Sequence, residues 1–265
     1  MNTTLLLDRD GAIATLTLNR PASLNALDPE MIEALIEHSA ALAADDSVRC
    51  VVLRGAGRHF MAGGDIRSFN DKLNNAPDER RHEFTRMVEH MHVAIENLQR
   101  MPHPVLASVH GAVAGFGLSL MCACDLAIAA DSSYFTSAYR HLGLTPDGGA
   151  SYTLPRLVGL KKAMEIVLLG ERFDASEALR LGLVNRVVGE SELQTVTHSV
   201  AMALATGPAL ALRNGKRLIN GSLSQSLSAQ LLAEAQSFGA CAASDDFAEG
   251  VRAFLDKRTP RFDDR

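Results

Sequence analysis

The fold class is decided by residues 104–130, PVLASVHGAVAGFGLSLMCACDLAIAA. Residues 104–109 have the apolar composition of a buried strand, Gly111 starts a turn, and residues 114–124 have the composition of an apolar helix. A further strand is predicted at residues 126–130. A strand, a turn, a helix and another strand in so short a stretch indicate an α/β protein.

Strands and helices also alternate before this stretch. Residues 13–18 alternate apolar residues with threonine, as a half-buried strand does, and the valine-rich residues 48–53 predict a buried strand. Between them, Asp28-Pro29 favours a helix start, and apolar residues recur at helical spacing as far as Leu42. Strand, helix and strand therefore follow one another here as well.

The remaining segments are richer in helices. Residues 67–97 are polar and charged with scattered apolar side chains, which indicates a loop and a surface helix that together form a lid. Asp174, followed three residues later by Glu177, resembles a capping box. Three further helices are predicted, near residues 208–218, 223–238 and 247–255. We expect a core at residues 1–200 and a C-terminal helical segment at residues 201–265.

Composition and charge exclude several classes of protein. The 265 residues are 47% hydrophobic and 22% charged, which is typical of a globular protein. A formal net charge of -5 with scattered lysine and arginine argues against a nucleic-acid partner. The four cysteines lack the spacing of a metal site or a disulfide framework. The longest apolar stretch, residues 112–124, is too short to cross a membrane, and no signal peptide is apparent, so a cytoplasmic location is expected.

Two glycine-rich turns, residues 62–65 and residues 115–117, carry the predicted chemistry. Each is expected where a buried strand passes into a helix, and the first N–H groups of a helix have no partner within the helix. Such donors, together with the helix dipole, stabilise an oxyanion. Either turn alone is equally well explained by helix packing, but two together point to an enzyme that binds an oxyanion.

Two other glycine motifs do not fit. A dinucleotide-binding fingerprint needs a third glycine that is missing after Gly115 and Gly117. A nucleophile elbow needs glycine on both sides of Ser119, but Met121 stands at the second of these positions.

Five parts of the chain carry a resemblance to a known family: LNRP with LNAL at 18–27, FMAGGD at 60–65, residues 104–125, GLTPDGG at 143–149 and residues 175–187. Through them, nearly the whole chain resembles the crotonase superfamily, the enoyl-CoA hydratase/isomerase family. The resemblance implies an α/β fold that is a spiral of ββα units with a C-terminal helical trimerisation segment. It also implies an acyl-CoA thioester substrate, coenzyme A as part of that substrate with no separate cofactor or metal, and a homotrimer or a dimer of trimers.

The resemblance also implies roles for individual residues. Ala62 and Phe116 would supply the N–H groups that bind the thioester oxygen as an enolate forms. The positions that match coenzyme A contacts are Ala22, Ser23, Leu24, Ala62, Gly63, Gly64, Asp65, Phe116, Tyr139, Phe254 and Lys257. The last two match a C-terminal pair that reaches the coenzyme A group, in some relatives from the neighbouring subunit.

The chain departs from the hydratase pattern at the acid–base positions. Hydratases of this family use two glutamates, and the matching positions are Ser119 and Tyr139. Asp147 instead stands where several family isomerases, and some dehalogenases, carry a catalytic aspartate. One carboxylate whose pKa is raised by an apolar pocket can take a proton from one carbon and return it to another. Double-bond isomerisation with Asp147 as acid and base is therefore favoured.

Structural roles compete with these assignments. Asp147 also suits a turn, Asp65 suits a helix cap better than catalysis, and Tyr139 either orients substrate or packs. We expect His59, His90 and His92 to be surface residues. A second carboxylate, Glu83 or Glu89, lies in the lid segment and is able to complete a pair.

Three other functions stay open. The first is hydration of a 2-enoyl-CoA, with water held by Asp147 and a carboxylate from the lid. The second is a non-catalytic CoA-binding protein, which the missing glutamates favour. The third, hydrolysis through Ser119, lacks a suitably placed histidine in the sequence.

Overall fold

Within residues 3–262, which the computed structural model describes, the main sheet has six strands in the order β1-β2-β3-β4-β6-β9. β1 and β2 are antiparallel, and all other neighbours are parallel. The strands are β1 (Leu5–Asp10), β2 (Ile13–Leu18), β3 (Cys50–Gly55), β4 (Val105–Val109), β6 (Leu126–Ala130) and β9 (Arg186–Val188).

A smaller sheet lies beside the first and is made of β5 (Ala112–Ala114), β7 (Tyr134–Thr136) and β8 (Phe173–Asp174). Because β5 follows β4 and β7 follows β6, the chain passes twice from the large sheet to the small one. Helix α4 (Phe116–Cys122) follows the first passage and helix α5 (Ala150–Val158) the second. This repeated order of strand, strand and helix confirms the expected α/β spiral of ββα units.

Helices cover both faces of the main sheet. On one face, buried residues of α1 (Pro29–Ala43), α3 (Pro77–Arg100) and α4 form the larger apolar core with the strands. On the other face, Leu193 and Ala201 of α8 (Leu193–Ala205) pack against β3, β4 and β6. The core also contains α2 (Ile66–Asn70), α6 (Leu160–Leu169) and α7 (Ala175–Arg180), with short 3-10 helices η1 (Pro21–Ser23), η2 (Tyr139–Leu142) and η3 (Glu190–Glu192).

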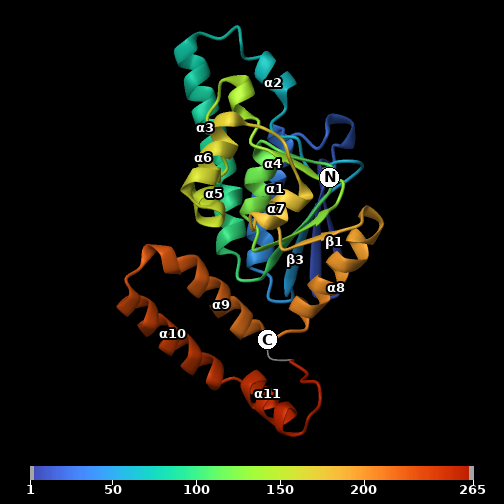
Figure 1. Ribbon diagram of the computed structural model, residues 1–265, viewed down its shortest axis with the longest axis vertical. Coiled ribbons are helices and arrows are strands. Elements are labelled where there is room, and N and C mark those ends of the chain that lie inside the picture. Colours follow the sequence, from blue (N-terminus) through green and yellow to red (C-terminus); the bar gives the residue numbers. More distant parts are fainter. Residues whose placement is uncertain (1–2, 263–265) are drawn as a thin grey trace.

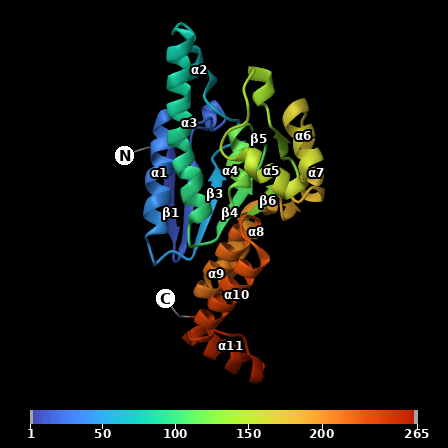
Figure 2. The ribbon, with the colours of Figure 1, turned by 90° about the vertical axis from the view of Figure 1, so that its left-hand side faces the viewer.

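The chain ends in a helical arm that extends away from the core, at the end opposite α2 (Figures 1 and 2). The arm consists of α9 (Ala209–Gly221), η4 (Ser222–Ser224), α10 (Leu227–Ala242) and α11 (Asp245–Leu255). It is attached to the core by Lys216, whose Nζ lies 2.7 Å from Oδ2 of Asp125. Large apolar side chains remain exposed along it: Ile219, Leu223, Leu227, Leu232, Phe238, Phe254 and Leu255.

Side-chain caps account for several helix starts. Asp28 accepts a hydrogen bond of 2.8 Å from the Met31 N–H, and Pro29 is the first helical residue, as the sequence predicts. Asp174 likewise accepts from the Glu177 N–H at 2.8 Å. The carboxylate of Glu177 pairs with Arg180 at 2.6 Å, so the second bond of the expected capping box is replaced by an ion pair.

Local patterns misplaced some elements. The apolar helix predicted at 114–124 begins only at Phe116, because residues 112–114 form β5 and pair with the distant β7. β1 was not predicted, since the polar side chains in its second half suit the exposed edge of a sheet. The expected boundary at residue 200 falls inside α8, whose Ala201 is buried on the sheet; the division into two parts stays a prediction.

Among the described residues, no single helix is long and apolar enough to cross a bilayer, and residues 190–205 and 209–224 pass that test only as a pair bent by 103°. Three or more metal-ligating side chains do not cluster anywhere in this part of the chain. All four cysteines are free, and burial raises the pKa of the Cys50 thiol to about 12. The cytoplasmic location remains a prediction.

Candidate active site

The two glycine-rich turns, the lid and the loop that carries Asp147 enclose one cavity of 410 Å³. Six of the predicted site residues line it: Ala62, Gly63, Gly64, Phe116, Tyr139 and Asp147. The rest of its wall is mostly apolar and comes from α1, α2, α3 and the loop before Asp147. A mostly apolar pocket with a few polar groups is the usual form of a small-molecule site.

Backbone contact holds the two turns side by side. The Met61 N–H donates to the Ala112 carbonyl at 3.0 Å, and the Ala114 N–H donates to the Met61 carbonyl at 2.9 Å. Helix α4 then passes so close that a Cβ on Gly117 would lie 2.4 Å from the Met61 carbonyl oxygen. Glycine is therefore required at position 117, and it fixes the distance between the turns.

The amide groups of these turns differ in what they bind. The Phe116 N–H, in the first turn of α4, and the Gly64 N–H donate to no acceptor in residues 3–262. The Ala62 N–H does not match this description, because it donates to the Leu24 carbonyl at 3.1 Å. This bond contradicts the expectation that Ala62 supplies an oxyanion donor, and Gly63 and Gly64 present the available amides of that turn.

Three side chains form a hydrogen-bonded chain at the opposite wall. The Tyr139 hydroxyl donates to Oδ1 of Asp147 at 2.5 Å. The Ser119 hydroxyl lies 3.1 Å from the same tyrosine oxygen, and since the tyrosine proton is already given to Asp147, Ser119 is the donor. Ser119 is fully buried and its hydroxyl is used in this way, which argues against its role as a nucleophile.

The surroundings of Asp147 favour its protonated form. Burial raises the pKa of the Asp147 carboxyl, and the Tyr139 hydrogen bond and His92 oppose this effect without overcoming it. Burial and the neighbouring Asp147 raise the pKa of the Tyr139 phenol, so this hydroxyl stays protonated as a donor. A half-buried carboxylate with a raised pKa in an apolar cavity is suited to proton transfer.

Of the three histidines expected at the surface, His90 is exposed and pairs with Glu33. The expectation is wrong for His92, which lines the cavity and accepts a hydrogen bond of 3.2 Å from the Gly148 N–H through Nε2. It is also wrong for His59, which is half-buried, with Nδ1 accepting from the Ala112 N–H at 3.1 Å.

The two candidate lid carboxylates differ in their position relative to the cavity. Glu83 is bound to Lys72 at 2.9 Å and to Asn75 at 3.2 Å, outside the cavity wall. Glu89 is exposed and belongs to that wall. If the lid supplies a second carboxylate, Glu89 is the better placed of the two.

Aromatic side chains of the lid cover the first turn. Phe69 of α2 and Phe84 of α3 meet edge to face, with ring centroids 4.9 Å apart. A Cβ on Gly64 would lie 2.8 Å from the tip of the Phe69 ring. The lid therefore packs directly on the turn that presents the Gly64 N–H.

Asp65 has a structural position. Its carboxylate accepts from the Arg67 N–H at 3.0 Å as the N-cap of α2 and pairs with Arg20 at 2.8 Å. The Arg20 hydrogen bond holds the pKa of Asp65 below its usual range. These contacts agree with a capping role, and Asp65 does not line the cavity.

The other residues expected to bind coenzyme A lie outside the cavity wall. Ala22 and Ser23 belong to η1, and the exposed Leu24 follows it, joined to the first turn through its carbonyl. Phe254 is 84% exposed on α11, and Lys257 follows that helix. Because the arm lies at the end of the molecule opposite α2, these two residues do not reach the cavity of their own chain (Figures 1 and 2).

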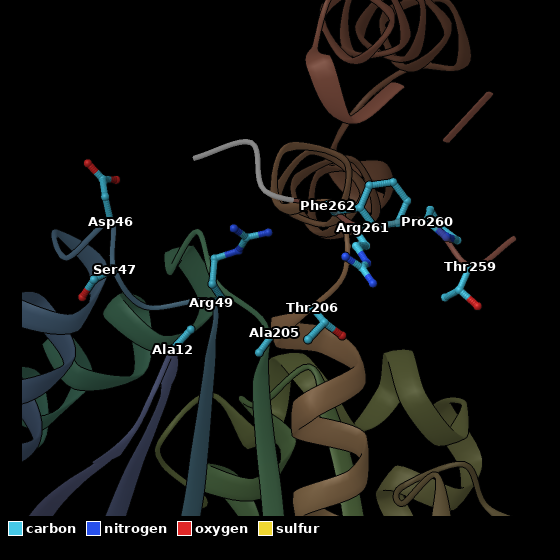
Figure 3. A pocket seen from close by; sticks show the side chains of 10 residues that line it. All are labelled: Ala12, Asp46, Ser47, Arg49, Ala205, Thr206, Thr259, Pro260, Arg261 and Phe262. Carbon is cyan, nitrogen blue, oxygen red and sulfur yellow. The ribbon is translucent and has the colours of Figure 1, made fainter. Parts of the chain in front are cut away.

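A larger cavity of 840 Å³ lies between the core and the C-terminal segment (Figure 3). Its charged side chains are Asp46, Arg49 and Arg261. It shares no lining residue with the cavity at the glycine turns and contains none of the predicted site residues. The smaller cavity is therefore the candidate active site.

The sequence contained a signal for the lid residues that was missed. Val88, His92 and Ile95 recur at helical spacing, and Met87 and Met91 follow the same inward face. This pattern places His92 among residues that contact the core rather than solvent. The free amide of Gly64 had no such signal, because hydrogen bonding of the backbone in an irregular turn depends on distant segments.

Comparison with known proteins decides the family. The family model described as enoyl-CoA hydratase/isomerase matches residues 8–265. The chain belongs to the enoyl-CoA hydratase/isomerase family. It is 38% identical to the 1,2-epoxyphenylacetyl-CoA isomerase of Escherichia coli over 252 residues, 94% of each chain. It is also 38% identical to a protein of Rhodobacter capsulatus named as a probable enoyl-CoA hydratase, over 254 residues that are 96% of this chain and 95% of the relative.

A solved structure supports the same membership. An enoyl-CoA hydratase from Polaromonas superposes with a TM-score of 0.91 at 36% identity, covering 97% of this chain and 99% of the other. As a member of the enoyl-CoA hydratase/isomerase family with this fold, the protein is an enzyme of acyl-CoA metabolism. Relatives with both hydratase and isomerase names match it over most of their length.

Proposed function

We propose that the protein isomerises the carbon–carbon double bond of an enoyl-CoA thioester, with Asp147 as the acid and base. The observation that carries the proposal is the hydrogen bond between Tyr139 and Asp147. It fixes Oδ1 of a half-buried carboxylate in the wall of an apolar cavity, where the other half-buried carboxylate, Asp28, is paired with Arg20.

The free amides of Gly64 and Phe116 bind the thioester oxygen in this proposal. The carboxylate of Asp147 removes a proton from C2 of a 3-enoyl-CoA, and the electron pair of that C–H bond moves toward the thioester oxygen. The same proton then passes from Asp147 to C4, and the thioester carbonyl is restored as the double bond settles between C2 and C3. Each amide donor is worth about 3 to 4 kcal/mol in such sites.

Hydration is disfavoured by the groups at the two glutamate positions. Ser119 and Tyr139 are hydroxyl groups that are already hydrogen-bonded to one another and to Asp147. A hydratase needs two groups that hold and activate a water molecule. Asp28 and Glu89 are the other carboxylates in the cavity wall. Asp28 is paired with Arg20, and the exposed Glu89 supports a hydratase only if the lid moves it inward.

The resemblance to the 1,2-epoxyphenylacetyl-CoA isomerase of E. coli supports an isomerisation, although the substrate in that name is an epoxide, while the hydratase names of other relatives support the alternative. A non-catalytic role is disfavoured by the raised pKa of Asp147. We also propose that Ala22, Ser23, Leu24 and Asp65 lie along the coenzyme A channel.

A homotrimer or dimer of trimers completes this proposal. The exposed apolar side chains of the arm suit burial against a neighbouring copy. In such an assembly, Phe254 and Lys257 would contact the coenzyme A bound to that neighbour, with Lys257 as a phosphate partner.

The test compares the wild-type protein with Asp147→Asn on 3-enoyl-CoA thioesters, with the products identified. Asn keeps an oxygen that accepts from Tyr139 but cannot take up a proton, so we expect isomerisation to fall at least a thousandfold with little change in KM. Asp131→Asn, on an exposed turn, is the matched control. Unchanged turnover in Asp147→Asn would exclude Asp147 as the base, and a hydrated product from the wild type would favour the hydratase.

A further inference from the structure

His92 joins the lid to the turn that carries Asp147. It lies in α3, and its Nε2 accepts a hydrogen bond of 3.2 Å from the Gly148 N–H. The side chain is half-buried and lines the cavity, whereas His90 on the same helix is exposed and bound to Glu33. Among the described residues, His92 is thus the histidine with a direct bond to the Asp147 turn.

The donor of this hydrogen bond, Gly148, has little freedom to move. Gly148 directly follows Asp147 and has a φ of +59°. A Cβ at this position would lie 2.8 Å from both the Phe116 ring and Cβ of Ser119. A shift of Gly148 therefore moves Asp147 relative to Phe116, whose amide is a proposed oxyanion donor.

The hydrogen bond depends on the charge of the imidazole. A neutral histidine has one ring nitrogen that accepts, but both nitrogens of the protonated ring are donors. The titratable groups that line the cavity with His92 are Asp28, Glu89, Tyr139 and Asp147. A charge on His92 lowers the pKa of Asp147, but it also removes the acceptor for Gly148.

We propose that His92 is a positioning residue that, in its neutral form, holds the Gly148 amide and so fixes Asp147 against the oxyanion-binding amides. The inference rests on the proposed proton-transfer role of Asp147. It couples the position of the lid helix to the geometry of the acid–base residue.

The experiment compares His92→Leu with His92→Gln. Leucine fills similar space but has no acceptor, whereas the side-chain oxygen of glutamine can take the place of Nε2 and does not titrate. His90→Leu, two residues earlier on the exposed face of α3, is the matched control. Thermal unfolding of each variant checks that the fold is kept.

We expect His92→Leu to lower kcat about tenfold with a smaller effect on KM, and His92→Gln to restore most of the loss. His90→Leu should behave like the wild type. Equal activity of all variants, or a glutamine variant as slow as the leucine variant, would overturn the proposal.

A second readout separates this inference from the proposed function. Exchange of the C2 protons of a saturated acyl-CoA with heavy water reports proton transfer by Asp147 without requiring isomerisation. If the wild type exchanges these protons but does not isomerise 3-enoyl-CoA, the proposed reaction fails while the role of His92 is still measured by exchange. Exchange that is equal in the wild type and His92→Leu would reject the positioning role alone.

Discussion

The Tyr139 hydroxyl donates to Oδ1 of Asp147 at 2.5 Å. Between the two residues in the sequence, the chain turns at Gly143, which has a left-handed backbone conformation. Ser119 donates to the same hydroxyl from α4. One oxygen of the carboxylate is therefore fixed, and in the proposed reaction Oδ2 exchanges the proton with substrate. Ser119 and Tyr139, at the positions where hydratases carry glutamate, thus hold the Asp147 side chain in place.

Replacing Tyr139 with Phe should raise the pKa of Asp147, because the Tyr139 hydrogen bond lowers that pKa in the wild type. The ionised base then forms only at higher pH, so the acid limb of kcat/KM should move to higher pH and activity near neutrality should fall. The measurement is a pH profile on a 3-enoyl-CoA. Ser119→Ala, which removes only the second donor, should shift the limb less. A limb that stays in place or moves to lower pH contradicts this account.

Replacing Asp147 with Asn should stabilise the fold at neutral pH. Burial raises the pKa of Asp147 in the folded state, so the ionised form costs stability, and this cost is present above the folded-state pKa. It disappears as the pH falls below the ordinary value of 3.8. We expect a gain of about 1 kcal/mol at pH 7, a size common for stabilising changes at active sites. Urea unfolding at pH 7 and at low pH measures it; a gain that persists in acid has another origin.

Gly148→Ala should destabilise the protein more than Gly143→Ala. Both glycines have a positive φ, +59° and +68°, so alanine is strained at either. Only at Gly148 would the added Cβ also meet other atoms, 2.8 Å from Phe116 and Ser119; at Gly143 it meets nothing within 4 Å. We expect an additional loss of about 1 to 3 kcal/mol from overpacking. Equal midpoints of thermal unfolding for the two variants would show that the site relaxes around the methyl group.

Lys216→Met should weaken the attachment of the C-terminal arm. Oδ2 of Asp125 lies 2.7 Å from the Lys216 ammonium and accepts from the Val105 N–H at 2.7 Å, in surroundings that raise the pKa of this carboxyl. Without the lysine, this carboxylate, whose side chain is 21% exposed, loses its counter-charge, and about 1 to 3 kcal/mol of stability should be lost.

The loss from Lys216→Met should shrink in acid, where Asp125 becomes protonated. A double-mutant cycle with Asp125→Asn tests this ion pair. We expect the double variant to lose less stability than the sum of the two single variants. Additive losses would mean that the two charges do not interact.

The sequence predicted the parts of the fold that depend on local patterns. The strands at 13–18 and 126–130 and the N-cap at Asp28 are found as expected. Strand β5 was not predicted, and its last residue, Ala114, was assigned to a helix, because three residues, AVA, carry no period and only pairing with β7 makes them a strand. Short elements of this kind are set by contacts between distant segments.

The site was predicted to a similar degree. From the sequence, Phe116, Tyr139 and Asp147 were expected to belong to one site, and in the structure they line one cavity. It assigned a donor role to Ala62, whose amide is bound to Leu24, and it missed His92. Which amide of a turn stays free, and which histidine of a polar helix turns inward, depends on packing that residue types alone do not specify.

The close contact between Gly117 and the Met61 carbonyl is made by the main chain, whereas the acid–base part of the site consists of side chains. The amides proposed to bind the oxyanion belong to the main chain and cannot be removed by exchanging side chains. The proposed acid–base residue, Asp147, and the two residues that hold it, Ser119 and Tyr139, act through their side chains. A directed-evolution library at these three positions would therefore sample different reactions while keeping thioester recognition, which makes this chain a candidate scaffold for new acyl-CoA chemistry.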